Sequence, residues 1–352
     1  MKSAPPTTGH APSTLFRLPF AVAAAFAVLT AVVAVASGLP LRDPDGFLGP
    51  SYVRLPLLLA ALILVDMIPS MLRRRTAQGG MLPAAIQELR RRWPAPRLVA
   101  TSVGLLTFYL AYVSYRNMKS FLPFVRDRVT DPLLQASDRW LLGGDHPGDV
   151  LQQVLGTGTS AHLLAAVYVS YLVFVPVSVA AALVWSRRLS HGAWYVTALS
   201  FNWILGALSY YALPSLGPIY VEPRHFSDLP DTAVTALQEA LYRNRVRVLA
   251  DPHATQSVHG IAAFASLHVS VVFTAAVMAH LLRLPRVIRA ALWAYTLLTA
   301  LATVYFGWHY VVDVAAGAAL GALAIWLAAL ATRSVGAATP GPAPVLATAG
   351  SV

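Results

Sequence analysis

The sequence contains eight stretches of mainly apolar residues that are each long enough to cross a bilayer as an α-helix. An α-helix rises about 1.5 Å per residue, so a hydrocarbon core of about 30 Å needs roughly 17 to 25 such residues. The stretches cover residues 18–39, 55–72, 98–115, 161–185, 193–213, 261–282, 290–307 and 308–332. We separate the last two at Gly307, because the joined run is too long for one helix across one bilayer. The pattern predicts an all-α polytopic membrane protein with about eight transmembrane helices.

Composition excludes several other classes of protein. Apolar residues make up 57% of the chain and charged residues 12%, which is too apolar for an ordinary soluble domain or for intrinsic disorder. The chain has no cysteine, so disulfides, thiolate nucleophiles and Cys-ligated metal centres are excluded. We find no His-Glu-x-x-His motif and expect neither a metal nor another cofactor. The net charge of +11 comes from short basic clusters between the apolar stretches, which indicates membrane topology rather than nucleic-acid binding.

These basic clusters predict the orientation of the chain. Arginines gather between the second and third stretches, between the fourth and fifth, and between the sixth and seventh. Cytoplasmic connections carry the excess of Lys and Arg, so these three connections and both termini are expected in the cytoplasm. The long connections 116–160 and 214–260 then lie on the opposite side, where such loops usually cap a bundle or line a site.

We expect three parts along the chain. Residues 1–97 hold an N-terminal tail, two transmembrane helices and a basic cytoplasmic loop, and residues 98–333 form a six-helix catalytic core. Residues 334–352 are rich in Ala, Pro and Gly and are expected to be a disordered tail. The composition, rich in Ala and Arg and poor in Lys, is typical of a GC-rich bacterial genome. A bacterial plasma (inner) membrane is therefore the expected location.

Three titratable residues stand at the extracytoplasmic ends of two predicted spans. His268 lies near the start of the stretch 261–282, and His309 and Asp313 open the last stretch. Ionisable side chains are costly in a span and are usually functional. A spacing of four residues on a helix places Asp313 beside His309, where the carboxylate can hold one ring N–H and leave the other nitrogen as a lone pair. Such a ring suits a nucleophile or a general base, and His268 on a separate helix suits a general acid.

Each of these residues also has a purely structural interpretation. A single His at a helix end is more often a hydrogen-bonding residue than a catalyst, and a His/Asp pair at spacing four can be a simple ion pair on a helix surface. Three such residues on two spans, facing long basic loops, favour catalysis. Two other functions remain open from these residues alone: a transporter with a His/Asp proton relay, and an inactive protein that binds anionic lipid.

The segment Phe264-Ala-Ser-Leu-His268, followed further along the chain by His309-x-x-x-Asp313, resembles the second and third signature motifs of the type 2 phosphatidic acid phosphatase superfamily. Its members are membrane lipid phosphatases and phosphotransferases that work without a metal. The pair His259-Gly260 before the second motif and the run 305–313 resemble more closely the branch that contains inositol phosphorylceramide synthase.

The resemblance implies a role for each motif residue. His309 would be the nucleophile that forms a phosphohistidine, and Asp313 would orient its ring. His268 would protonate the departing oxygen, and Ser266 would bind a phosphate oxygen.

The first motif of the family supplies cations, a Lys and an Arg separated by six residues, and this chain has Lys119 and Arg126 at that spacing. The resemblance implies that both neutralise phosphoryl oxygens in the transition state. Asp127 replaces the usual Pro after that Arg, and Thr303 stands where the third motif carries an Arg. Another cation must replace that Arg. Arg224 is one candidate, and a basic run that equally suits lipid headgroups offers others: Arg243, Arg245 and Arg247.

Together these features predict an enzyme that breaks a lipid phosphoester or phosphoanhydride at the extracytoplasmic face through a phosphohistidine. The expected partners are the bilayer, a lipid phosphate donor and an acceptor. The branch resemblance favours an alcohol acceptor such as inositol or a glycan hydroxyl. The close alternative is a lipid phosphate or polyprenyl diphosphate phosphatase, in which water is the acceptor. A proton-coupled transporter is the less favoured third reading.

Overall fold

The protein is all-α, as predicted. The computed structural model describes residues 14–43, 45–46, 49–74, 81–186 and 188–332, and the predicted tail 334–352 lies outside them. A short antiparallel hairpin, β1 (Asp45–Gly46) with β2 (Gly49–Pro50), and a 3₁₀-helix, η2 (Pro223–Phe226), accompany the helices. The described residues contain thirteen α-helices: α1 (Arg17–Ser37), α2 (Ser51–Arg74), α3 (Met81–Arg92), α4 (Ala95–Val125), α5 (Asp131–Leu141), α6 (Pro147–Leu155), α7 (Thr159–Trp185), α8 (Leu189–Ala212), α9 (Pro218–Val221), α10 (Ala233–Ala250), α11 (Leu267–Leu281), α12 (Arg286–Tyr305) and α13 (Val311–Ala331).

Eight of these helices coincide with the eight apolar stretches of the sequence. Within the described residues, six of them are long and apolar enough to cross a membrane: α1, α2, α4, α7, α12 and α13. The other two are α8, which has 24 residues and carries polar side chains, and α11, which is apolar but has only 15 residues. The chain is therefore an integral, multi-pass membrane protein.

Two predicted boundaries can be compared with the helices. The division at Gly307 is confirmed, because α12 ends at Tyr305 and α13 begins at Val311. The stretch 261–282 was predicted to be helical throughout, and this is wrong for its first six residues. The segment 261–266 is not helical. The N–H groups of Ala263 and Phe264 instead bond to Ser215, which is far away in the sequence, and those of Ala265 and Ser266 also bond outside the segment.

The helix α8 lies at the centre of the bundle. It packs against α4, α7, α11 and α13, and every residue from Gly192 to Trp203 is buried. Asn202 on α8 donates to Thr274 on α11 (3.0 Å) and accepts from Ser270, which is also on α11. Asn202 is tolerated on this helix because the buried part of α8 is enclosed by protein, which supplies hydrogen-bond partners to the amide.

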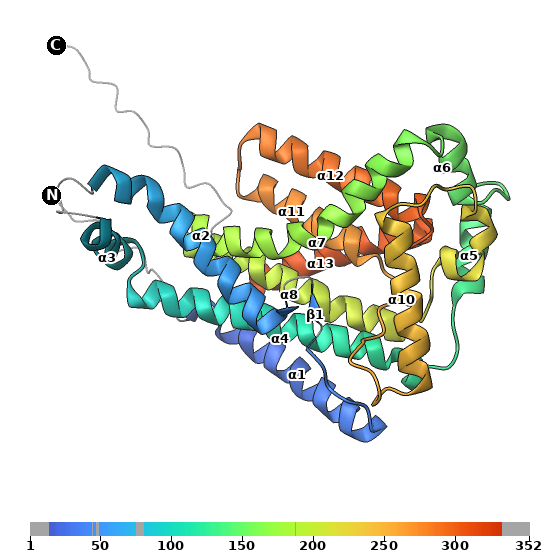
Figure 1. Ribbon diagram of the computed structural model, residues 1–352, viewed down its shortest axis with the longest axis horizontal. Helices are drawn as coiled ribbons and strands as arrows, with labels where there is room; N and C mark the ends of the chain where they lie inside the picture. Colours follow the sequence, from blue (N-terminus) through green and yellow to red (C-terminus); the bar gives the residue numbers. More distant parts are fainter. Residues whose placement is uncertain (1–13, 44, 47–48, 75–80, 187, 333–352) are drawn as a thin grey trace, which may run out of the picture.

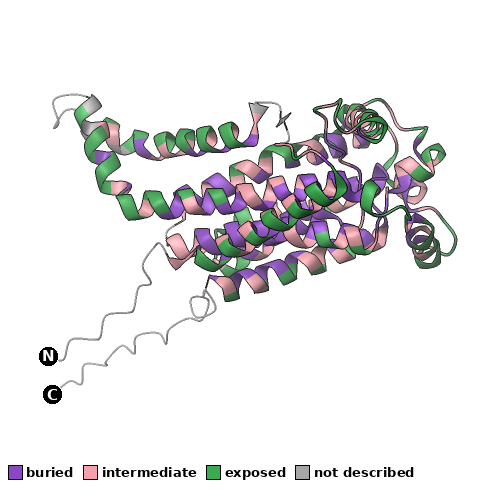
Figure 2. Cartoon of the chain, turned by 90° about the horizontal axis from the view of Figure 1, so that it is seen from below, coloured by how far each residue is buried: buried purple, intermediate pink, exposed green. Residues whose placement is uncertain are grey.

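The outward faces of the surrounding helices are exposed (Figure 2), and many of the exposed side chains are apolar. Val35 on α1 is 84% exposed, and Leu297 on α12 and Trp326 on α13 are similarly uncovered. Exposed apolar surface of this extent is unfavourable in water and favourable against lipid chains. The surface therefore agrees with a bundle embedded in a bilayer.

The two ends of the bundle differ (Figure 1). The amphipathic helix α3 lies at one end, and α5, α6 and α10 cover the opposite end. At the covered end, α11 and α13 approach each other closely. A Cβ on Gly317 would lie 2.4 Å from the carbonyl oxygen of Ser266, and one on Gly321 would lie 2.7 Å from that of Ser270. These glycines let the two backbones touch, which brings the first turns of α11 and α13 side by side.

Candidate active site

His309 lies in the tight turn between α12 and α13. Gly307 adopts a left-handed conformation (φ 67°), and the N–H groups of Trp308 and His309 both donate to the carbonyl of Thr303 (2.9 and 3.2 Å). A Cβ on Gly307 would lie 2.4 Å from the ring of Phe226. Backbone conformation and space therefore both require glycine here. Thr303, which stands where the family motif has an Arg, fixes this turn through its carbonyl.

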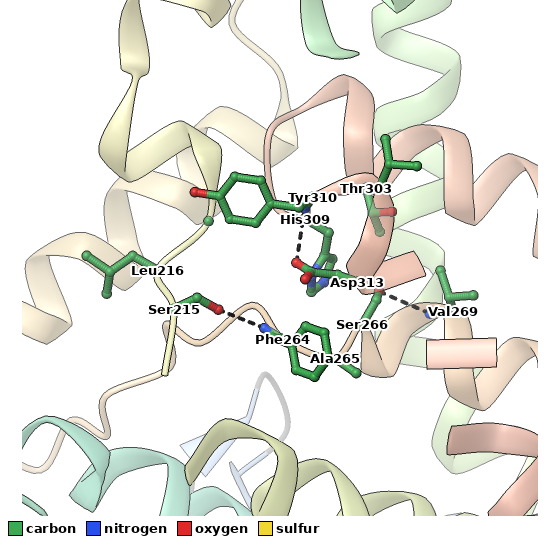
Figure 3. A network of polar contacts seen from close by, with 12 residues as sticks. Ser215, Leu216, Phe264, Ala265, Ser266, Val269, Thr303, His309, Tyr310 and Asp313 are labelled. Atoms are coloured by element: carbon green, nitrogen blue, oxygen red, sulfur yellow. Dashed lines mark hydrogen bonds and ion pairs between the residues drawn. The ribbon is translucent and has the colours of Figure 1, made fainter. Parts of the chain in front are cut away.

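Asp313 connects His309 to the start of α13. Its Oδ2 accepts the N–H of Tyr310 (3.0 Å) and lies 3.4 Å from Nδ1 of His309, and both side chains are buried (Figure 3). The sequence predicted this contact on one helical face. The structure makes it differently, because His309 precedes α13 and the carboxylate reaches back over the first turn of the helix. The N-terminus of a helix favours a negative charge, which helps to hold the carboxylate there.

His268 stands in the first turn of α11 and faces the same cavity as His309. Its ring stacks on Tyr168 (ring centroids 4.6 Å apart) and contacts Tyr171 at 4.4 Å. The centroids of the two histidine rings are 6.0 Å apart. The structure thus brings together all three residues predicted to perform the chemistry.

Ser266 is fully buried at the N-cap of α11. Its hydroxyl accepts from the N–H of Val269 (3.4 Å), and its own N–H donates to the carbonyl of Asp313 (3.0 Å). Ser266 therefore ties the start of α11 to α13. It does not line the cavity, and its predicted phosphate contact stays a prediction.

The cavity at this end of the bundle has a volume of about 220 Å³. Lys119 lines it together with the two histidines, and its ammonium lies over the ring of Tyr210 at 4.8 Å. Burial first, and then the charge of Lys119, lower the pKa of His309 well below its usual range. The ring is therefore neutral at pH 7. If Nδ1–H donates to Asp313, Nε2 carries the free lone pair.

The remaining predicted cations do not reach the cavity. Arg126 follows the last residue of α4 and is exposed, and Arg224 is exposed on η2. Of the basic run on α10, Arg245 donates to Nε2 of His259 (2.7 Å) outside the cavity. This contact leaves His259 neutral, because burial and the arginine charge lower its pKa to about 3.

Two arginines that the sequence analysis did not select line the cavity instead. Arg116 stands one turn before Lys119 on α4, and Arg54 is near the start of α2. A usable signal existed for Arg116, since it directly follows the predicted span 98–115 on the same side as Lys119. No comparable signal marked Arg54, because α2 meets this cavity only through the tertiary fold.

Two aspartates of α5 hold the loops around the site and were also missed. Asp131 is 1% exposed and accepts from the N–H groups of Leu216 (3.0 Å) and Gly217 (2.9 Å) and from the hydroxyl of Tyr310 (2.9 Å). Asp138 accepts the N–H of Val311 (3.0 Å), and burial raises its pKa to about 6. Their spacing of two helical turns on one amphipathic segment was the available signal.

Within the described residues, one further group of side chains has the composition of a metal site. The ligand atoms of His146, Glu222 and His225 lie within 4.8 Å of one another. Asp149 contacts His225 at 2.7 Å, and Arg139 pairs with Glu222 at 2.9 Å. The group joins α6 to η2 outside the cavity. Because the arginine already neutralises Glu222, an ion-pair cluster explains this arrangement without a metal.

The cavity therefore offers one defined set of chemical groups. A neutral imidazole held by a carboxylate can attack an electrophile, a second imidazole can transfer a proton, and a cation can stabilise negative charge that develops nearby. Aromatic and aliphatic side chains line the remaining walls. The arrangement suits an amphiphilic substrate with an anionic reactive group.

Comparison with known proteins agrees with this reading. A family model described as the PAP2 superfamily matches residues 133–327, which is more than half of the chain. The matched region contains His268, His309 and Asp313 and begins after Lys119. No curated protein and no solved structure gives a significant match.

Proposed function

The chain belongs to the PAP2 superfamily and is therefore an enzyme of the lipid phosphatase and phosphotransferase class, and from this premise we propose a double displacement through a phosphohistidine. Nε2 of His309 attacks the phosphorus of a lipid phosphoester or phosphoanhydride, and the bond between phosphorus and the leaving oxygen breaks. His268 gives a proton to that oxygen. The acceptor hydroxyl then returns a proton to His268 as its oxygen displaces His309 from phosphorus.

One observation carries the proposal: Asp313 fixes the ring of His309 while His268 faces the same buried cavity from another helix. Lys119 supplies positive charge for the phosphoryl oxygens. A bound phosphate brings negative charge beside His268, which stabilises the protonated ring that a general acid requires.

We propose an alcohol such as inositol or a glycan hydroxyl as the acceptor. The support is the likeness of the segment 259–268 to the inositol phosphorylceramide synthase branch. Water as acceptor, which would make the protein a lipid phosphate or polyprenyl diphosphate phosphatase, is the second candidate, because the first chemical step is identical.

The distribution of arginines supports a site at the extracytoplasmic face, with both termini in the cytoplasm, and the Ala- and Arg-rich, Lys-poor composition supports a bacterial plasma membrane. We also propose a catalytic core at 98–333, preceded by two helices that pack on it.

A transporter is disfavoured, since Asp66, the acidic residue deepest in a predicted span, pairs with Arg92 at 3.0 Å. A proton relay would leave such a carboxylate facing a pathway.

The test is a labelling experiment with a radioactive lipid phosphate donor. We expect a label that survives alkali and is lost in acid, and that is absent from His309→Ala. His162→Ala is the matched control, because His162 is an exposed histidine of α7. His268→Ala should label slowly with an alkyl phosphate and normally with nitrophenyl phosphate, whose leaving group needs no proton.

The acceptor is then identified on the labelled protein. If an alcohol is the acceptor, adding inositol or a glycan speeds the loss of label and gives a phosphoester. If water is the acceptor, inorganic phosphate appears at an unchanged rate. Absence of both label and phosphate release, with lipid binding intact, would refute the proposed chemistry.

A further inference from the structure

A pair of arginines lies in the cavity in addition to Lys119. Arg116 on α4 and Arg54 on α2 both line it, and Nε of each is buried without a hydrogen-bond partner. Their side-chain contacts are to neutral hydroxyls, since Arg116 meets Tyr112 at 3.5 Å and Arg54 meets Ser51 at 3.2 Å. Neither forms an ion pair with a carboxylate in the part of the chain that the structure describes.

A guanidinium that is partly removed from water and has no carboxylate partner carries a cost in free energy. Removing a cation from water is unfavourable unless an anion or several acceptors replace the water, and hydroxyls replace only part of it. Elsewhere in this chain a partly buried arginine does find a carboxylate, as Arg92 does with Asp66. Two unpaired arginines in one cavity indicate a site arranged for an anionic ligand.

The groups along the cavity follow an order. Lys119 lines the cavity together with His268 and His309, with its ammonium over the ring of Tyr210, and we assign it to the reacting end. Arg116 is three residues earlier on α4, about 4.5 Å further along the axis at about 1.5 Å per residue. Beyond it the lining becomes apolar and aromatic, with Phe108 on α4 and Val175 on α7. A ligand that fits this order has a reactive phosphoryl group, a second anionic group and then a hydrophobic chain.

We propose that Arg54 and Arg116 form a second phosphate subsite, and that the donor is a lipid diphosphate whose inner phosphate they bind. The proposal rests on the phosphotransfer function above, because it assigns the outer phosphoryl group to His309. In that reaction the anhydride oxygen leaves with the inner phosphate and takes the proton of His268. Arg54 and Arg116 both lie outside the matched family region.

A different role for the same arginines is the main competitor. In this role they would substitute for the third-motif arginine, whose position is occupied by Thr303 in this chain, and would bind the oxygens of the reacting phosphoryl group. In that case their loss weakens binding of monophosphates and diphosphates equally. The second subsite predicts that only the diphosphate is affected, and this difference is measurable.

The experiment measures binding of dodecyl monophosphate and dodecyl diphosphate to the detergent-solubilised full chain carrying His309→Ala. This background cannot form the phosphohistidine, and fluorescence of Trp203 and Trp308, which line the cavity, reports occupancy. We expect the diphosphate to bind at least about tenfold more tightly, because charge-assisted hydrogen bonds to the inner phosphate are gained. Arg54→Gln and Arg116→Gln should each bring the ratio toward one, and Arg116→Lys should keep most of it.

The matched control is Arg128→Gln, an exposed arginine just beyond α4, which should leave the ratio unchanged. Thermal unfolding of the unliganded variants separates a binding role from a structural one. Removing an unpaired, half-buried cation should leave the melting temperature unchanged or raise it, whereas a structural arginine would lower it.

Two results would overturn the subsite: a ratio near one before substitution, or a ratio that both Arg→Gln variants leave unchanged, whether the two ligands keep their affinity or are weakened equally. Because phosphoenzyme formation is not needed here, failure of the labelling experiment and failure of this one are distinguishable.

Discussion

Replacing Asp131 with alanine tests whether α5 holds the active-site loops in place. The buried carboxylate accepts from the N–H groups of Leu216 and Gly217 and from the hydroxyl of Tyr310, the residue after His309. The substitution leaves three buried donors without their acceptor. Each such donor costs about 1–3 kcal/mol, and partial relaxation and entry of water reduce the sum to roughly 3–5 kcal/mol.

The expected result is a loss of both stability and turnover. In detergent we expect the melting temperature to fall by roughly 5 °C or more. Turnover should fall more than the apparent substrate affinity does, because Tyr310 positions the nucleophile rather than the lipid chain. Asp131→Asn keeps one acceptor oxygen and should give an intermediate effect.

The control is Asp145→Ala, an exposed aspartate in the connection that follows α5. It removes a charge of the same sign without removing a buried acceptor. If Asp131→Ala melts and turns over like Asp145→Ala, the reasoning that α5 anchors the site is wrong.

Further predictions concern the site itself. Lys119→Met should lower kcat/KM by about 10²–10³-fold, whereas the exposed Arg126→Gln should stay within about twofold, and equal effects would contradict the placement of these cations. Asp313→Asn should slow label formation by about 10²–10⁴-fold, since the amide no longer fixes the tautomer of His309. Gly307→Ala should destabilise the protein by at least about 1–3 kcal/mol in thermal unfolding, because φ is positive and Phe226 occupies the Cβ position. Because the pKa of His309 is lowered, the acid limb of the phosphorylation rate, where the ring gains a proton as pH falls, should lie below about 6.5; a limb centred at that value would contradict the burial argument.

Sequence alone predicted the membrane helices and the three residues that we propose react. Apolar runs of span length are a local property, and any helix of that length satisfies its own backbone hydrogen bonds in lipid. His309 and Asp313 are close in sequence, so their contact needed no knowledge of the fold. The family motifs added His268 through its likeness to known segments.

Tertiary structure decided which charged groups serve the site. Lys119 and Arg126 match one motif, but only Lys119 lines the cavity, since Arg126 lies beyond the end of α4. Arg54 reaches the cavity through α2. Asp131 reaches Tyr310 across 179 positions of sequence. Contacts between distant segments depend on how whole helices pack, and a single sequence carries no direct record of that packing.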